Sequence, residues 1–217
     1  MKTIVIESQK GGSGKTMLAA HLAVEAQRCS EEAWVIDTDR QATLSKWHER
    51  RKDETPQRLD APVERIPEAL DKAAGQGAQY CFIDTAPTIS DQNTRLLKLA
   101  DLILIPVRPS PSDLWAVAET VALVKEAGKP FLFVVTQAKS QATITAQAIA
   151  ALSEHGRVAQ SFIADRVAYA AAMTGGNTAP EVSSKGHAAQ EIEALWVEIK
   201  ACFHENSKPI KKKVTHG

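Results

Sequence analysis

The sequence predicts an α/β protein with a single doubly wound, mostly parallel sheet and helices on both faces. Short apolar runs alternate along the chain with longer segments in which apolar residues recur every three or four positions, as in helices. The short runs are almost continuously apolar, which is typical of parallel strands buried on both faces. A length of 217 residues with 44% hydrophobic residues suits one domain of this class, and the alternation predicts right-handed crossovers.

Five apolar runs are expected to form the main strands, and these are Thr3–Glu7, Ala33–Asp37, Gln79–Asp84, Leu102–Val107 and Pro130–Thr136. A weaker run at Val158–Ile163 predicts a further strand, and the residues around Val63 fit a short edge strand. Helical spacing predicts helices over Lys15–Arg28, Thr43–Lys52, Pro67–Gly75, Asp91–Leu99, Asp113–Ala127, Thr143–Glu154 and Ala188–Phe203.

Charge and cysteine content exclude several classes of protein. The 26 basic residues balance 26 acidic ones, so any binding to nucleic acid or membrane must come from a local patch. The three cysteines are far apart, which indicates reduced thiols rather than a zinc site or a disulfide framework. No apolar run approaches the roughly 18–20 residues of a membrane span, and the first strand begins too early for a signal peptide. We therefore expect a cytoplasmic protein.

The stretch SQKGGSGKTM, residues Ser8–Met17, lies between the first strand and the first helix, which is the context of a phosphate-binding loop. Glycines let the backbone wrap closely around phosphate, and successive N–H groups form an anion site at the helix N-terminus. The residues expected to bind nucleotide here are Gly11, Gly12, Ser13, Gly14, Lys15, Thr16 and Met17. Lys15 would bridge the β- and γ-phosphates, and the Thr16 hydroxyl would bind Mg²⁺. The alternative is an ordinary glycine-rich turn.

Three aspartates, Asp37, Asp39 and Asp84, lie at or just beyond the carboxyl ends of predicted strands. Ligands of open α/β sheets bind at that edge. A single aspartate there is often only a helix N-cap. Three of them facing one phosphate loop favour a shell of Mg²⁺ and water, because Mg²⁺ retains water and needs few direct carboxylates.

Four motifs carry a resemblance to the ParA/MinD family of ATPases. KGGSGKT matches the deviant Walker A pattern of that family, with the additional lysine at Lys10. VIDTDRQ resembles its switch I segment, CFIDTAP its Walker B and switch II segment, and IPVRPSPSD the proline-containing stretch after the next strand. The likeness is greatest to short plasmid-type ParA proteins. It implies a deviant P-loop NTPase fold, with an ATPase domain over residues 1–204 and a basic, disordered tail over residues 205–217.

The resemblance also implies roles for individual residues. Lys10 would cross a homodimer that sandwiches ATP and contact phosphate in the partner's site, so that Lys10, Lys15 and Asp39 are the catalytic residues. Asp39 would position the attacking water and bind the metal, Asp84 would hold Mg²⁺ through water, and Asp37 would support either role. Arg40 and Ala86 replace prolines that are usual in the family, and Ser8 replaces a common asparagine. These departures remove none of the groups expected to bind phosphate or Mg²⁺. They bear on the rigidity of the switch segments and on the rate of hydrolysis.

The base is expected to be adenine. Guanine-specific relatives place an aspartate at the end of a late strand, where this chain has Lys139, which has only hydrogen-bond donors. Thr136 and Gln137 are expected near adenine, with a second contact from Ile163–Val167. The alternative for Thr136 and Gln137 is a role as cap and loop residues. The expected cofactors are therefore ATP and Mg²⁺.

The family likeness implies nonspecific DNA binding, a nucleoid location and a centromere-binding (ParB-like) adaptor that stimulates weak hydrolysis. Candidate DNA contacts are Lys46–Lys52, Arg166, Lys185 and Lys208–Lys213, and each has a solvated surface as its alternative. Trp47 and Trp115 are expected to be either core residues or partner contacts. The last predicted helix carries acidic residues on its polar face, which opposes membrane binding. Alternative functions are positioning of another cargo, such as a microcompartment or a chemoreceptor array, and a nucleotide-gated binding module with very weak hydrolysis.

Overall fold

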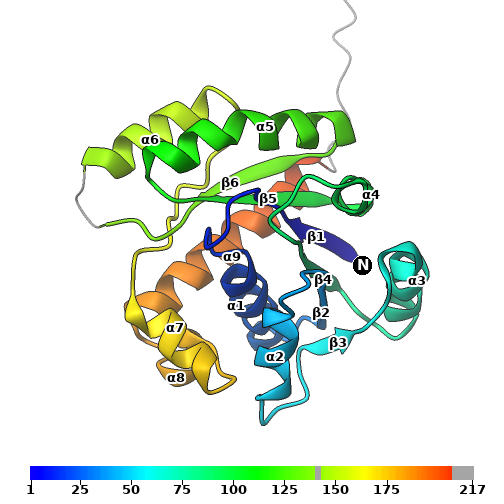
Figure 1. Cartoon of the computed structure of the whole chain (residues 1–217). Coiled ribbons are helices and arrows are strands. Elements are labelled where there is room, and N and C mark those ends of the chain that lie inside the picture. Colours follow the sequence, from blue (N-terminus) through cyan, green and yellow to red (C-terminus); the bar gives the residue numbers. More distant parts are fainter. Residues whose placement is uncertain (140–142, 207–217) are drawn as a thin grey trace, which may run out of the picture.

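The computed structural model describes residues 1–139 and 143–206. In this part of the chain one sheet of parallel strands has the order β3-β2-β4-β1-β5-β6 (Figure 1). The strands are β1 (Lys2–Ile6), β2 (Ala33–Asp37), β3 (Gln57–Leu59), β4 (Tyr80–Asp84), β5 (Leu102–Val107) and β6 (Phe131–Val135). The doubly wound α/β fold predicted from the sequence is confirmed.

Helices cover both faces of the sheet. They are α1 (Lys15–Arg28), α2 (Thr43–Glu49), α3 (Ile66–Gly75), α4 (Asp91–Leu99), α5 (Pro111–Ala127), α6 (Thr143–Ser153), α7 (Val167–Thr174), α8 (Ala179–Val182) and α9 (His187–Asn206). Successive strand residues point to opposite faces, so Ile4 and Ile6 pack with α1, α2 and α7–α9, whereas Val5 packs on the side of α3–α6. Figure 1 shows the sheet between these two layers.

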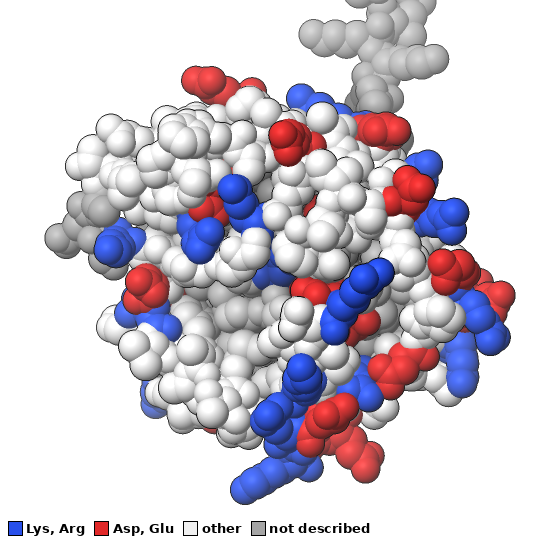
Figure 2. Space-filling view, viewed as in Figure 1, with Lys and Arg blue, Asp and Glu red and all other residues white. Residues whose placement is uncertain are grey.

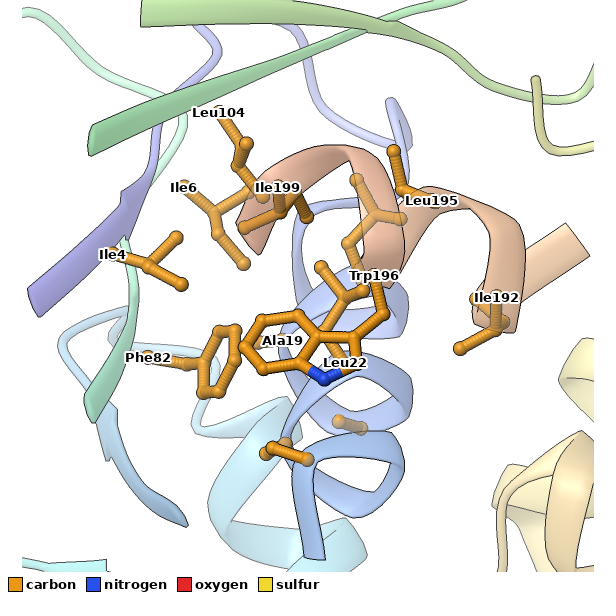
Figure 3. Close-up of a cluster of buried hydrophobic side chains, with 14 of the residues drawn as sticks. Ile4, Ile6, Ala19, Leu22, Phe82, Leu104, Ile192, Leu195, Trp196 and Ile199 are labelled. Carbon is orange, nitrogen blue, oxygen red and sulfur yellow. The ribbon is translucent and has the colours of Figure 1, made fainter. Parts of the chain in front are cut away.

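The helix α9 is anchored in the core by Trp196, which is 1% exposed. In Figure 3 its indole lies beside Phe82 of β4, with Ile192, Leu195 and Ile199 on the same helix. The indole N–H donates to a carboxylate oxygen of Glu31 over 3.0 Å. The predicted terminal helix is therefore a packing element of the domain, since its apolar side is buried against α1 and the sheet.

Two strand predictions are wrong. The edge strand is Gln57–Leu59, and Val63–Arg65 instead forms a turn of 3₁₀ helix that leads into α3. Residues 158–163 form no strand beside β6, where only isolated bridges from Val158 and Ala164 occur. The reason is a competing acceptor, because the carboxylate of Glu198 binds the backbone N–H groups of Gln160 and Ser161 over 2.8 and 2.7 Å.

The helices α7 and α8 were not expected from the sequence, whereas the bounds of α1 and α4 agree with the prediction. The last helix continues to Asn206, so the predicted boundary at residue 204 falls within its final turn. The predicted basic tail lies almost wholly outside the described residues. Within the described part of the chain, no helix combines the length and apolar character that crossing a membrane requires.

Candidate nucleotide site

The candidate site is built where the central parallel strands end. β1 lies between β4 and β5, and its last residue, Ile6, is in register with Asp84 of β4. Asp84 is in turn paired with Asp37 at the end of β2. The carboxyl ends of three neighbouring strands therefore bring the glycine-rich loop and two of the predicted aspartates to one edge.

The loop between β1 and α1 has the backbone form of an anion site. Gly12 and Gly14 have φ angles of 73° and 100°, in the left-handed region that favours glycine. Gly14 is the N-cap of α1, and Lys15 and Thr16 are its first residues. A glycine turn that opens a helix presents backbone N–H groups and the positive end of the helix dipole to an anion.

The side chain of Lys15 lies along the loop and is 7% exposed. Its ammonium group donates to the carbonyl oxygens of Ser8 over 2.9 Å and Lys10 over 3.4 Å. Burial lowers the pKa of Lys15, and the nearby carboxylates, led by Asp84, oppose that shift. The loop's own carbonyls therefore hold the lysine beside the position where phosphate is expected.

Thr16 and Asp84 join α1 to β4. The Thr16 hydroxyl donates to Oδ2 of Asp84 over 2.6 Å. The other oxygen, Oδ1, is buried and has no hydrogen-bond partner within the described residues, and the same holds for Oγ of Ser13. Burial raises the pKa of Asp84 to about 7, against the lowering effect of the Thr16 hydrogen bond. A buried polar atom without a partner calls for a ligand, so these residues fit nucleotide-bound Mg²⁺.

Asp37 and Asp39 have different surroundings from Asp84. The carboxylate of Asp37 accepts from the backbone N–H of Asp39 over 3.0 Å and of Ser45 over 2.8 Å, so it braces the start of α2. Asp39 accepts from the N–H of Gln41 over 3.0 Å and lines a cavity of about 420 Å³ with Arg40. Across residues 1–139 and 143–206, no three His, Cys, Asp or Glu side chains are grouped to hold a metal ion. A metal here would need oxygens from phosphate, Thr16 and water in addition to Asp84.

A second cavity, of about 310 Å³, opens beside the start of α1. It is lined by Gly14 and Met17 at the start of α1, by Gln137 just after β6, by the segment Ile163–Arg166, and by Tyr169, Ala170 and Met173 of α7. The segment predicted as a second base contact, 163–167, thus lies next to the phosphate loop. Tyr169 and Met173 were not predicted, although the apolar run that begins at Val167 is a signal for this helix.

Thr136 and Gln137 bind the loop itself. The Thr136 hydroxyl donates to the carbonyl of Ser13 over 2.7 Å, and the Gln137 amide donates to the carbonyl of Gly12 over 2.7 Å. These two residues therefore hold the loop in place from β6, and Gln137 also lines the cavity. Their contact with adenine remains a prediction.

Lys10 is half-buried and lies, with Ser8, beside Val107 and Asp113 at the start of α5. Sequence reasoning missed a neighbouring cation, Arg108. Its Nε and Nη2 donate to both carboxylate oxygens of Asp113 over 3.0 and 3.1 Å, while Nη1 lies 3.5 Å from where a side chain on Gly12 would begin. The stretch IPVRPSPSD contained this residue, but its approach to the loop depends on the fold.

The predicted DNA contacts fall into two groups in the structure, those that are exposed and those that are buried or paired with a carboxylate. Lys46, Arg50, Lys52 and Lys185 are exposed. Arg51 is not, because its side chain is 3% exposed, pairs with Glu181 over 2.8 Å and stacks on Trp47 at 4.8 Å. Arg166 is paired with Glu191 over 2.7 Å. Figure 2 shows basic side chains gathered around the loop after α2, with acidic ones among them. The Lys208–Lys213 prediction lies outside the described residues.

The two tryptophans that the sequence left undecided have opposite environments. Trp47 is 2% exposed and belongs to the core, where its indole N–H donates to the carbonyl of Asn177 over 3.1 Å. Trp115, near the start of α5, is 79% exposed. The core interpretation therefore holds for Trp47, and contact with a partner remains a prediction for Trp115.

The strand, loop and helix, with Lys15, Thr16 and Asp84 at their junction, define a P-loop nucleotide-binding protein. The family model described as CobQ/CobB/MinD/ParA nucleotide binding domain matches residues 4–179, and the chain belongs to this family. Its ParA and MinD members are ATPases.

Individual relatives agree with this assignment. The chain is 27% identical over 225 residues to Protein ParA of Rhizobium radiobacter, covering 97% of this chain and 100% of that protein. It is 26% identical over 212 residues to the maintenance of carboxysome distribution protein A of Halothiobacillus neapolitanus, covering 91% and 95%. The fold is similar to that of the MinD cell division protein of Aquifex aeolicus, with a TM-score of 0.78, 18% identity and coverage of 93% and 98%.

Proposed function

We propose that the protein is an ATP-dependent, dimerising ATPase that binds DNA nonspecifically and drives partition of a plasmid or other DNA. The observation that carries this proposal is the unpartnered Oδ1 of Asp84, buried next to Thr16 at the mouth of a glycine loop that already holds Lys15. Such a junction binds a nucleoside triphosphate with Mg²⁺, because it offers a cation, backbone N–H groups and a carboxylate in one place.

The chain's own residues then divide the work. Loop N–H groups and Lys15 hold the phosphates, Thr16 and Asp84 hold the metal and its water, and the cavity beside Met17 and Tyr169 takes the base. Mg²⁺ supplies charge neutralisation on the phosphate oxygens. Asp39 orients the attacking water from the edge of its cavity. Little base chemistry is required, since phosphoryl transfer depends mainly on positioning and charge stabilisation.

Lys10 is proposed to act in trans. Lys10 is half-buried beside residues of β5 and α5, whereas the ammonium group of Lys15 is held by the loop's own carbonyl oxygens. A cation supplied by a second ATP-loaded subunit neutralises phosphate charge only when the two subunits meet, so dimerisation would report the nucleotide that is bound.

The dimer would hold DNA through phosphate contacts from exposed lysines and arginines, and a centromere-binding (ParB-like) adaptor would stimulate weak hydrolysis and release. The protein would then be cytoplasmic and associated with the nucleoid. Similarity to ParA supports plasmid partition, and similarity to the carboxysome distribution protein supports a second candidate, the positioning of another cargo by the same cycle.

The test is ATP turnover by the purified chain, with and without nonspecific duplex DNA, compared with the Lys15→Ala variant. Turnover that needs Mg²⁺ and Lys15 supports the proposal. Nucleotide binding without turnover under any condition would favour the nucleotide-gated binding module instead. The product of the neighbouring gene, tested as a stimulator, separates DNA partition from positioning of another cargo.

A further inference from the structure

A carboxylic acid is buried directly in front of the phosphate loop. Glu7 is 0% exposed and lies between the last residue of β1 and Ser8. Its backbone N–H extends the hydrogen bonding of the sheet by donating to the carbonyl of Leu104 over 3.0 Å. Burying such a group is costly without compensating hydrogen bonds. Its position in the sequence, at the end of the predicted strand Thr3–Glu7, does not by itself indicate a functional role.

The compensating bonds come from the segment that follows Asp84. Oε2 of Glu7 accepts from the hydroxyl of Thr85 over 2.9 Å and from the side-chain amide of Asn93 over 3.0 Å. Thr85 is 0% exposed and Asn93 is 3% exposed. We call these three residues the Glu7 clasp.

Asn93 ties the clasp to residues 85–90, here named the switch segment. The same amide nitrogen donates to the carbonyls of Ala86 and Thr88, both over 2.9 Å. The backbone N–H of Asn93 donates to the hydroxyl of Ser90, which is the N-cap of α4. Asn93 is therefore hydrogen-bonded to Glu7, to the switch segment and to the N-cap of α4.

The hydrogen atoms of the clasp are fewer than its acceptors. Thr85 has one hydroxyl hydrogen and Asn93 has two amide hydrogens, and they face the oxygens of Ile6, Glu7, Ala86 and Thr88. A proton on Oε2 of Glu7 would donate to the Thr85 oxygen and leave the Thr85 hydroxyl hydrogen for the carbonyl of Ile6, whereas Oε1 of Glu7 is buried without a partner within the described residues. Burial raises the pKa of Glu7 to about 7, against the lowering effects of Thr85, Lys15 and Asn93.

The switch segment borders the place where hydrolysis is expected. A cavity of about 420 Å³ is lined by Asp39 and Arg40 and, further along the chain, by Ala86, Pro87, Thr88, Ser90 and Asn93. We propose that the Glu7 clasp positions the switch segment against the phosphate loop, and that ATP turnover depends on this positioning whereas ATP binding does not. This inference rests on the proposed ATPase function.

The deciding variant is the double replacement Glu7→Leu with Asn93→Leu. A single Asn93→Leu change would leave a buried acid with only Thr85 as a side-chain donor and destabilise the fold, whereas the double change removes the acid and its amide donor together and frees the carbonyls of Ala86 and Thr88. Thr94→Val is the matched control, because it removes one side-chain hydrogen bond to the switch segment, from the Thr94 hydroxyl to the Ser90 carbonyl, while the backbone N–H of Thr94 still donates to that carbonyl and the clasp is intact. Glu7→Gln is the conservative variant, since its amide can both accept and donate in place of the acid.

For the double variant we expect a folded protein, a KM for ATP within about threefold of the original, and a kcat lower by about tenfold or more. Hydrogen exchange at residues 86–90 should become faster than in Thr94→Val. Glu7→Gln should retain more turnover than Glu7→Leu. Unchanged kcat and exchange in the double variant would overturn the proposal, as would equal loss of turnover in the Gln and Leu variants.

Failure of the ATPase proposal can be distinguished from failure of the clasp proposal. If the original chain shows no turnover at all, the exchange measurement still decides the clasp on its own. Faster exchange confined to residues 86–90 then supports the positioning role, and unchanged exchange overturns it.

Discussion

The hydroxyl of Thr16 donates to Asp84 over 2.6 Å and so joins the first turn of α1 to the end of β4. The bond occupies one carboxylate oxygen and leaves the other, Oδ1, buried without a partner within the described residues. This free oxygen is the reason for proposing that Mg²⁺ binds at Asp84 when it arrives with the nucleotide.

The first prediction concerns this carboxylate. Asp84→Asn keeps the shape and can still accept from Thr16, but it removes the negative charge. We expect Mg²⁺-dependent ATP affinity to fall by about 10–100-fold while binding in EDTA changes little, as measured by nucleotide titration under both conditions. Asp101→Asn is the control, because Asp101 lies beside Lys2 at the amino ends of the strands, away from the candidate site. An equal effect in Mg²⁺ and EDTA would contradict a role at the metal.

The two loop lysines should separate binding from dimerisation. Lys15→Ala should abolish ATP binding, because it removes the cation held inside the loop. Lys10→Ala should retain ATP binding and lose ATP-dependent dimerisation, which multi-angle light scattering measures with a non-hydrolysable analogue. Dimerisation of Lys10→Ala at the level of the original chain would refute the role in trans.

Glu7 should make the free energy of unfolding depend on pH. Its pKa is raised from 4.5 to about 7 in the folded state, so the stability present below pH 4.5 is lost as pH rises through 7. Glu7→Gln does not titrate and should be more stable than the original by up to about 3 kcal/mol at pH 8, with little difference at pH 5. Urea unfolding at the two pH values checks this. A gap independent of pH would show that Glu7 is ionised when buried.

The two tryptophans provide a matched pair for stability. Trp47→Ala should lower the free energy of unfolding by about 3–5 kcal/mol, because it removes a core side chain and the stacking surface of Arg51. Trp115→Ala should change it by less than about 0.5 kcal/mol, because the side chain is 79% exposed. Thermal unfolding measures both. If Trp115→Ala alone weakens ATP-dependent dimerisation, its exposed ring is a partner contact.

DNA binding should depend on salt through the exposed cations of α2 and of the residues just after it. Replacing Lys46, Arg50 and Lys52 by alanine should weaken retention of duplex DNA and reduce the salt slope by about one per lost phosphate contact. The control replaces Lys72, Lys98 and Lys125, which are exposed on helices of the opposite layer, with the same change in charge. Equal effects of the two triple variants, measured by salt titration, would exclude a specific contribution from α2.

The sequence predicted the fold well where local signals agreed with tertiary structure. The bounds of α4 follow from Ser90, whose hydroxyl caps the helix, and those of α1 from the glycine loop that opens it. The strand Gln57–Leu59 escaped notice because two of its three residues are polar, so no apolar run marks it. Residues 158–163 were misassigned because the competing carboxylate of Glu198 is distant in sequence.

The site shows the same division. Residues of the loop could be placed because a strand, a glycine turn and a helix fix their relation locally. Asp84 could be placed because its motif marks the carboxyl end of a strand, although its bond with Thr16 joins residues 68 positions apart. The approach of Arg108 to Gly12 and the burial of Glu7 against Asn93 could not, since each joins segments separated by more than eighty residues. Such contacts exist only once the sheet order is known.

Asp37 has a consequence for how α2 can respond to nucleotide. Both of its carboxylate oxygens are bonded to backbone N–H groups, one at Asp39 and one at Ser45. These bonds hold α2 at the end of β2, and Trp47 packs the helix against the core. We therefore expect a rearrangement near the phosphates to involve the few residues between these anchors rather than α2 itself, so that the cations in and after α2 keep their distance from the phosphate loop.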